Sequence, residues 1–246
     1  MRRRAGRSST LVAAATAAVL AVSALATAQS AVDDVVAKNL AAKGGADKLR
    51  TVTSVRTTGR MKGARGVATM TMWTKRPNSM RQEVVADGRT SITGFDGTTL
   101  WVVNPLAGPD ARALTGPAAN RAREQADDFD SVLLDYKNKG YSVDLVPSLE
   151  PGSVPRLRVT KKTGRVQLIY LDPATFLEQR ITTEFDQGGV KTVVETELAN
   201  YKAVDGMMVP FTVRQSVNGQ VQGEVTYDSV QFNLPLNDDL FQMPKK

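Results

Sequence analysis

The chain has 246 residues, with 32 Lys and Arg against 25 Asp and Glu, and it contains neither histidine nor cysteine. Without these two residue types there is no imidazole base, no His-ligated zinc site, no thiol nucleophile and no disulfide. The Ser-x-x-Lys, Walker A and Gly-x-Gly-x-x-Gly motifs are also absent. These absences exclude the common serine–lysine, P-loop and dinucleotide chemistries, and no metal or cofactor is implied.

The first 28 residues have the pattern of a secretory signal peptide. Four arginines in the first seven positions precede a small, apolar run from Leu11, which ends in Ala26-Thr27-Ala28. A membrane anchor is the alternative, but this run is rich in Ala, Thr and Ser, whereas a bilayer span needs about 20 strongly apolar residues. We expect cleavage after Ala28, export to the periplasm and a soluble mature chain.

The remaining residues, 29–246, fit a single domain. The signal segment holds four arginines and no acid, so the mature chain has 28 basic and 25 acidic residues, a formal charge of +3. The high pI of the full chain therefore says little about nucleic acid. With few aromatic residues and no dense basic face, we exclude a nucleic-acid partner.

Residues 31–50 predict a helix, because apolar residues from Val32 to Leu49 recur at helical spacing. Gly44-Gly45 interrupts the pattern, which favours one helix to Lys43 and a short turn at 46–49. From Val52 onward the period changes to two, and turn dipeptides follow at intervals: Asp87-Gly88, Asp96-Gly97, Thr163-Gly164, Gly188-Gly189, Asp205-Gly206 and Asn218-Gly219. The fold class is therefore mainly β (α+β). We expect an antiparallel sheet of about eleven strands, coiled into a barrel or half-barrel.

The β pattern breaks between residues 106 and 139. Gly108-Pro109 and Gly116-Pro117 mark a loop, and residues 118–126 and 129–137 look helical. The second helix carries an apolar set: Phe129, Val132, Leu133, Leu134 and Tyr136. An amphipathic insertion in a β domain needs an apolar surface to cover, so we expect a helical lid over the mouth of the coiled sheet.

Two groups of polar residues leave alternatives open. Glu195 and Glu197 share one strand face, about 7 Å apart, which suits a carboxylate hydrolase but is also typical of a solvated sheet face. Asp127-Asp128-Phe129-Asp130 lacks EF-hand spacing and fits a helix N-terminus better than a calcium site.

Two stretches carry the tryptophans: Met72-Trp73-Thr74-Lys75-Arg76-Pro77-Asn78 and Asp96-Gly97-Thr98-Thr99-Leu100-Trp101-Val102-Val103-Asn104-Pro105. Each indicates a strand that ends at a proline, so both tryptophans are expected at a rim beside an opening. Met61, Met70, Met72 and Met80 cluster in the same strands. Flexible thioethers suit either an adaptable apolar binding surface or a gap-filling core.

These stretches resemble the LolA superfamily of periplasmic outer-membrane lipoprotein carriers. The resemblance implies a hydrophobic half-barrel that is closed by helices and shields acyl chains from water. It implies an arginine latch at Arg76, which in the family bonds the lid backbone, and no catalytic residue. The lid would carry the apolar set named above. The implied cavity residues are Met70, Met72, Trp73, Met80, Val84, Trp101 and Val103.

The sequence departs from LolA where Met80, Gln82 and Val84 replace bulky aromatic residues, which leaves the cavity either roomier or more polar. The implied partners are an acylated lipoprotein or another lipid, with membrane-side donor and acceptor proteins, and the implied state is a monomer. Two alternatives remain open: a sensor module of the RseB type that binds lipoproteins or an anti-sigma factor, and a glycolipid- or isoprenoid-binding protein.

Overall fold

The computed structural model describes residues 29–245, apart from 65, 118, 121–122, 124–128, 147–155 and 188–189. The expected signal peptide, most of the expected lid helix at 118–126 and the Gly188-Gly189 turn lie outside the described residues. Among the helices that the structure does describe, none has the length and apolar character needed to cross a membrane.

The helical part of the chain begins as the sequence predicts. Residues 29–42 are helical, and α2 (Ala46–Arg50) follows after a turn at Gly44 and Gly45. Gly44 has φ +117°, and a Cβ there would stand 2.6 Å from the backbone oxygen of Gly206. Glycine thus lets the helix end approach the sheet, where the Met208 N–H donates to the Lys43 carbonyl at 3.2 Å.

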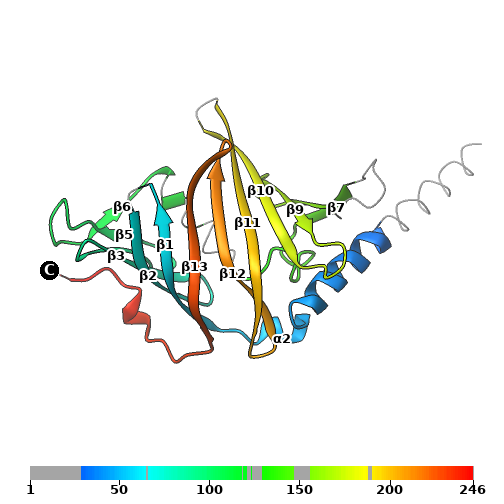
Figure 1. Ribbon diagram of the computed structural model, residues 1–246, viewed down its shortest axis with the longest axis horizontal. Coiled ribbons are helices and arrows are strands. Elements are labelled where there is room, and N and C mark those ends of the chain that lie inside the picture. Colours follow the sequence, from blue (N-terminus) through cyan, green and yellow to red (C-terminus); the bar gives the residue numbers. More distant parts are fainter. Residues whose placement is uncertain are drawn as a thin grey trace, which may run out of the picture.

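The rest of the described chain forms one open antiparallel sheet of 13 strands, two more than the sequence predicts (Figure 1). The strands are β1 (Ser54–Gly63), β2 (Gly66–Lys75), β3 (Ser79–Ala86), β4 (Arg89–Phe95), β5 (Leu100–Val103), β6 (Arg112–Leu114), β7 (Ser142–Val146), β8 (Arg156–Thr160), β9 (Val166–Leu171), β10 (Glu178–Gln187), β11 (Val190–Val204), β12 (Met207–Val217) and β13 (Gln220–Phe232). A short 3₁₀ helix, η1 (Asp238–Leu240), follows near the C-terminal end.

Three of the expected turn dipeptides close two-residue hairpins. Asp87-Gly88, Asp205-Gly206 and Asn218-Gly219 all have positive φ at both residues, between 47° and 78°. This geometry matches the right-handed twist of the flanking strands, and Asx-Gly pairs adopt it at low cost. The sequence therefore predicts these hairpins correctly.

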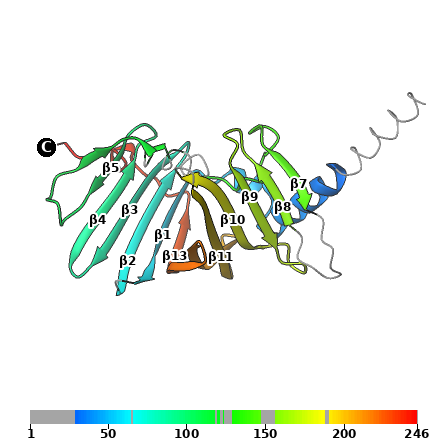
Figure 2. The ribbon, with the colours of Figure 1, turned by 90° about the horizontal axis from the view of Figure 1, so that it is seen from above.

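The strand order is β6-β5-β4-β3-β2-β1-β13-β12-β11-β10-β9-β8-β7, so the first and last strands pair in the middle of the sheet. β6 and β7 are consecutive in the chain but occupy opposite edges, as Figures 1 and 2 show. A flat sheet with 12 strand spacings would be about 58 Å wide, and the 27 residues 115–141 can reach about 90 Å. The connection is thus long enough to cross one face of the sheet, and it does so: Ala119 packs against β4 and β5, whereas Leu133 packs against β7 to β9.

Alternation along the strands assigns each side chain to one of two faces. We call the inner face the one that carries Val55 and Thr57 of β1, and the outer face the one that carries Arg56 and Thr58. The main buried cluster lies where residues 29–42 and the crossing connection pack against β7 to β9. Its members are Val32, Val36, Val132, Leu133, Tyr136, Val143, Leu157, Val159, Ile169 and Leu171.

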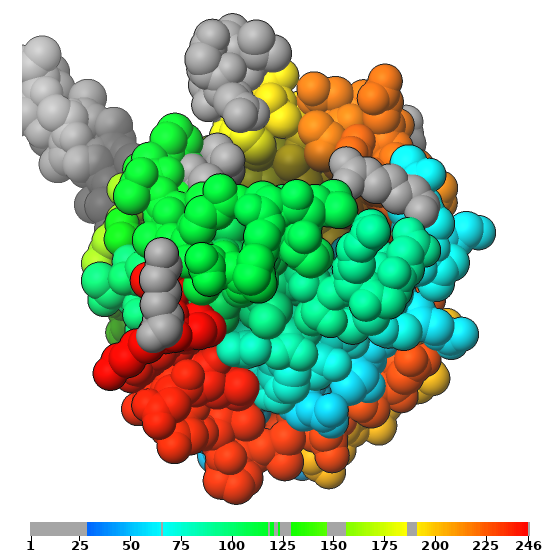
Figure 3. Space-filling view, turned by 90° about the vertical axis from the view of Figure 1, so that its left-hand side faces the viewer, coloured from blue at the N-terminus to red at the C-terminus, as the bar shows by residue number. Residues whose placement is uncertain are grey.

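The C-terminal segment, residues 233–245, is bound to the β1–β5 half of the sheet. The Asn233 N–H donates to the Ser54 carbonyl at 2.9 Å, and Lys75 Nζ donates to the Leu236 carbonyl at 2.7 Å. Further on, the indole N–H of Trp101 donates to the Phe241 carbonyl at 2.8 Å. Figure 3 shows this segment, in red, lying against the first half of the sheet.

Gly94 gives a test of this arrangement, because the Trp101 ring occupies the space where a Cβ would stand. We expect Gly94→Ala to destabilise the fold by about 1–3 kcal/mol, the usual cost of overpacking, in urea unfolding followed by circular dichroism. Gly63→Ala is the matched control, since a Cβ there meets only the Gln222 oxygen at 3.4 Å. Equal stability of the two variants would contradict the packing of Trp101 on Gly94.

Candidate functional site

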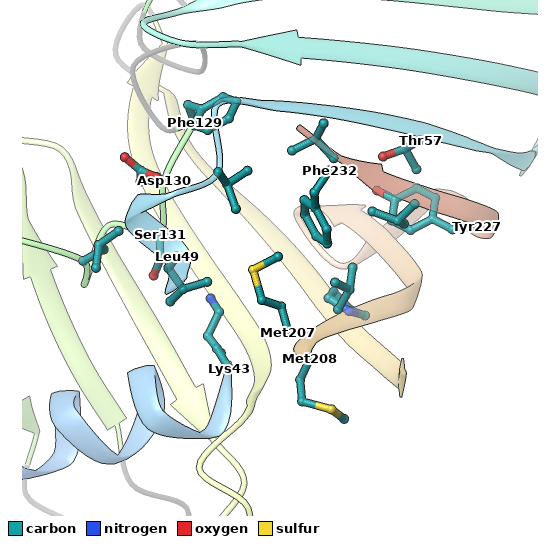
Figure 4. Close-up of a pocket in the computed structure, with 16 residues that line it drawn as sticks. Lys43, Leu49, Thr57, Phe129, Asp130, Ser131, Met207, Met208, Tyr227 and Phe232 are labelled. Carbon is teal, nitrogen blue, oxygen red and sulfur yellow. The ribbon is translucent and has the colours of Figure 1, made fainter. Parts of the chain in front are cut away.

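An apolar cavity of about 220 Å³ lies between the inner face and the crossing connection (Figure 4). Its floor comes from β1, β12 and β13, one side comes from α2 and the residues around it, and its roof comes from residues 129–134. The described lining residues are Lys43, Leu49, Val52, Val55, Thr57, Phe129, Asp130, Ser131, Leu134, Met207, Met208, Val209, Pro210, Tyr227, Val230 and Phe232. In Figure 4, Met207 points toward Phe232, whereas Met208 points away from it.

The roof differs from the helix that the sequence predicts at 129–137. Residues 132–140 form successive turns, and 129–131 are irregular. Asp135 has φ +53°, a left-handed conformation that ends a right-handed helix. Gly140 with φ +68° ends the turns before β7. Residues 132–140 thus cross the sheet as a series of turns, whereas residues 117, 119, 120 and 123, earlier in the connection, are helical.

The apolar residues of this segment are divided between two environments. Phe129 and Leu134 line the cavity. Val132, Leu133 and Tyr136 instead belong to the main buried cluster, with exposed fractions of 9%, 0% and 7%. Withdrawing the whole segment from the sheet would therefore break the core, so only the Phe129 end can move at low cost.

Arg76 binds the roof, although not through the contacts that the resemblance implies. Its Nη1 and Nη2 each donate to an oxygen of Asp130 at 2.6 Å, and its Nε donates to the Val52 carbonyl at 2.6 Å. The guanidinium carbon also lies 4.9 Å from the centre of the Phe129 ring. The partner on the roof is thus a carboxylate, and the backbone partner belongs to the residues after α2. Paired charged hydrogen bonds of this kind are among the strongest that side chains make.

Two further ion pairs fasten the same segment from the helical side. Arg50 of α2 donates to both oxygens of Asp135, at 3.0 and 2.7 Å. Lys137 donates to Asp33 at 2.7 Å, and the Tyr136 hydroxyl donates to Asp33 at 2.6 Å. The Arg50 hydrogen bond lowers the pKa of Asp135, and the Lys137 hydrogen bond is the largest cause that lowers the pKa of Asp33.

The charges at the edge of the cavity are already paired. Lys43 Nζ donates to both carboxylate oxygens of Glu178 at 2.9 Å, and the two side chains are 15% and 8% exposed. Asp130 is held by Arg76 as described above. The cavity therefore offers a ligand hydrocarbon contacts and neutral polar groups rather than a free charge.

The expected cavity residues divide between the two faces of the sheet. Pairing with β1 and β3 puts Met70, Met72, Met80 and Val84 on the inner face. The cross-strand row Arg56–Trp73–Arg81–Gly94–Trp101 lies on the outer face, and Val103 lies on the same face. The expectation that Trp73, Trp101 and Val103 line the cavity is therefore wrong.

The four inner-face residues do not border the cavity either, judged from its described lining. Met80 packs against Phe95 and Leu100, and Ala119 of the connection lies against the same cluster. Met70 is buried, with 5% exposed. These methionines fill space on the inner face, next to the cavity but outside its wall.

The two groups of acidic residues that the sequence raised as candidate sites, Glu195 with Glu197 and Asp127 to Asp130, lie in different surroundings. Arg180 lies 3.5 Å from Glu195 and Arg214 lies 3.9 Å from Glu197, so both glutamates meet arginines on the outer face, opposite the cavity. Asp127 and Asp128 lie outside the described residues. Asp130 is the carboxylate that binds Arg76.

Sequence reasoning missed most of the cavity wall. Met207 and Met208 were visible as a pair, and Val230 and Phe232 follow the period-two pattern of an apolar strand face. Nothing local, however, indicates that β13 pairs with β1 and thereby places Phe232 opposite Val55. Lys43 and Asp130 carried no signal that would separate them from surface charges.

No family model matches the sequence, and no curated protein matches it. Solved structures do match. A DUF1329 family protein from Desulfovibrio piger is 15% identical, with TM-score 0.57, over 86% of this chain and 97% of its own. A putative outer membrane lipoprotein-sorting protein domain from Vibrio parahaemolyticus is 15% identical, with TM-score 0.54, over 85% and 94%. A LolA superfamily protein from Nitrosomonas europaea is 14% identical, with TM-score 0.54, over 86% and 97%.

The chain has a LolA-like fold. The evidence is structural, because identities of 14–15% in these comparisons indicate shared architecture only. Within the LolA-like fold, the cavity lies where the connection between the two edge strands crosses the inner face.

Replacing Arg76 tests its hold on the roof. In Arg76→Leu, Asp130 loses its paired donors, so we expect the amides of residues 129–134 to exchange with solvent about 10- to 100-fold faster in hydrogen-exchange mass spectrometry. Arg60→Leu is the control, since Arg60 binds Asp228 at 3.2 Å with both side chains more than half exposed. Unchanged exchange in Arg76→Leu would show that the roof is held without this pair.

The Arg50–Asp135 pair predicts an acid-sensitive contribution to stability. The pKa of Asp135 is lowered below its ordinary value of 3.8 in the folded chain. The stabilisation is therefore complete above about pH 4 and is lost as the pH falls through the lower folded-state pKa. We expect the difference in urea midpoint between wild type and Asp135→Asn to be constant from about pH 7 to 5 and to shrink by pH 3. A difference that grows toward low pH would contradict this assignment.

Proposed function

We propose that the protein is an exported carrier or binder of acyl chains, in which the cavity under residues 129–134 shields a hydrocarbon tail from water. The observation that supports it most directly is the cavity itself, whose described wall is almost wholly apolar and whose two charged groups are paired. An outer-membrane lipoprotein-sorting role is the finer form of this proposal. The resemblance around Arg76 and the LolA-like fold support it.

The size of the cavity indicates how much of a ligand the protein can take in this conformation. At about 220 Å³ it is smaller than the roughly 300–1,000 Å³ of pockets for drug-sized ligands. It suits part of one hydrocarbon chain, and several chains need the roof to move. Each buried methylene contributes about 0.8 kcal/mol. Part of this gain is offset by the apolar roof contacts that the chain displaces, which keeps transfer reversible.

The contacts of residues 129–134 indicate which part of the roof would move when a ligand enters. Arg76 holds Asp130 and stacks on Phe129 at the cavity edge, whereas Leu133 is fully buried in the core. An entering chain would therefore displace the Phe129 end of the segment and leave the Leu133 end in place. In this proposal Arg76 is the latch of the cavity, acting through a carboxylate.

The cellular setting follows from the same proposal. The protein acts in the periplasm after removal of residues 1–28, as a monomer that receives acylated lipoprotein or another lipid from a membrane-side donor and passes it to an acceptor. It needs no catalytic group. The carboxylate hydrolase alternative loses support because Glu195 and Glu197 meet arginines on the outer face.

Filling the cavity tests the proposal. Val55→Trp puts an indole into the cavity wall, so we expect it to weaken binding of a palmitoyl chain at least tenfold, measured by native mass spectrometry with palmitoylated peptide. Val85→Trp is the matched control, because Val85 is 40% exposed on the outer face. Circular dichroism establishes that both variants fold. Equal binding by wild type and Val55→Trp would contradict the cavity as the ligand site.

A further inference from the structure

Two hydroxyl groups interrupt the apolar wall of the cavity. Thr57 of β1 is only 5% exposed, and Tyr227 of β13 lies beside it across the strand pair, with Gly59 as its direct partner. Both side chains line the cavity. Figure 4 shows their oxygens together, on the side that faces Phe232.

Neither hydroxyl has a hydrogen-bond partner in the part of the chain that the structure describes. Other hydroxyls on the same two strands do: Thr58 and Ser229 bond each other across the outer face at 2.7 Å. Tyr201 on β11, which is separated from β13 by β12, donates to the Glu178 carbonyl at 2.8 Å. Among the described side chains, Asn39 Oδ1 is the one fully buried polar atom without a partner, so both cavity hydroxyls remain accessible from the cavity, where a ligand's acceptor can reach them.

The pKa of Tyr227 agrees with this geometry. It is raised, and burial is the sole cause, with no hydrogen bond or neighbouring charge contributing. Tyr201 differs, because the charge of Glu178 adds to burial in raising its pKa. Tyr227 therefore presents a neutral, partly desolvated hydroxyl to the cavity.

The charged groups at the cavity edge do not compete for a ligand's polar atom. Lys43 is bound to Glu178, and Asp130 is bound to Arg76. An anionic headgroup would have to break one of these pairs and leave a partly buried charge without its partner, which is costly. A neutral acceptor avoids that cost and restores the hydrogen bonds that both hydroxyls lack.

We propose that Thr57 and Tyr227 form a polar subsite that binds the carbonyl oxygen of an acyl ester or amide, with the attached chain in the apolar part of the cavity. This assignment rests on the proposed acyl-chain function and adds to it a chemical preference for acyl over alkyl ligands. The two hydroxyls donate to the carbonyl oxygen, which has two lone pairs to accept them.

A pair of ligands that differ only at this position provides the test. 1-Monopalmitoylglycerol has the ester carbonyl, and 1-O-hexadecylglycerol has the same chain length and headgroup without it. Affinities are measured by displacement of anilinonaphthalene sulfonate from the purified protein. We expect wild type to bind the ester about three- to tenfold more tightly than the ether, the range of one or two net hydrogen bonds.

The variants are Tyr227→Phe, Thr57→Val and the two combined, each of which removes an oxygen and keeps the side-chain volume. We expect the preference for the ester to fall in each single variant and to vanish in the double variant, while ether binding stays unchanged. Tyr170→Phe is the control, because Tyr170 pairs with Arg180 on the outer face. The melting temperature of unliganded Tyr227→Phe should be equal to or above that of wild type, because its hydroxyl makes no bond.

The outcomes separate the two proposals. Binding of both ligands with equal affinity by wild type, or a preference that persists in the double variant, overturns the carbonyl subsite and leaves the acyl-chain function standing. Binding of neither ligand overturns the acyl-chain function, and the subsite with it. A lower melting temperature in unliganded Tyr227→Phe would assign the hydroxyl a structural role and contradict the subsite.

Discussion

The pairing of β1 with β13 is the constraint on which the rest of the structure depends. It joins the first and last strands in the middle of the sheet, so β6 and β7 lie at opposite edges. Residues 115–141 must then cross a sheet face to connect them. The roof of the cavity is thus a consequence of strand order, and the same pairing places Phe232 opposite Val55 in the cavity floor.

The second constraint is that a strand presents consecutive residues to opposite faces. The inner face carries methionines and the cavity, while the outer face carries arginines, tryptophans and the C-terminal segment. Trp101 is fully buried, yet it bonds the C-terminal segment through Phe241 and is not part of the described cavity wall. Both tryptophans therefore belong to the outer face of the sheet, and the cavity is lined mainly by aliphatic and thioether side chains together with Phe129, Tyr227 and Phe232.

Local signals in the sequence predicted the local structure well. The Asx-Gly pairs predicted three hairpins, and the helical spacing of apolar residues predicted the first helix and its end at Gly44-Gly45. The roof was harder, because a left-handed Asp135 in a helical pattern has no sequence signature that separates it from an ordinary helical aspartate. Ion pairs from the roof segment to Arg50 of α2 and to Asp33 hold the roof in its observed conformation. The partners in these pairs lie about 85 to 105 positions apart in the sequence.

One wrong expectation could have been avoided from the sequence. Met72 and Trp73 are adjacent on a strand, so they cannot both face one cavity. The proline that follows Trp73 placed it near a strand end but said nothing about the face. The pairing of β1 with β13, in contrast, joins residues about 170 positions apart, and no local pattern determines that register.

The most direct test of the account is to locate a bound chain on the protein. A palmitoyl ester that carries a photoreactive diazirine near the end of the chain is bound, irradiated and mapped by peptide mass spectrometry. We expect adducts in the peptides that contain Leu49 to Val55, Phe129 to Leu134 and Met207 to Pro210, and fewer of them in Val55→Trp. Adducts confined to the outer face around Trp73, or no adducts above those of a water-soluble diazirine, would contradict it.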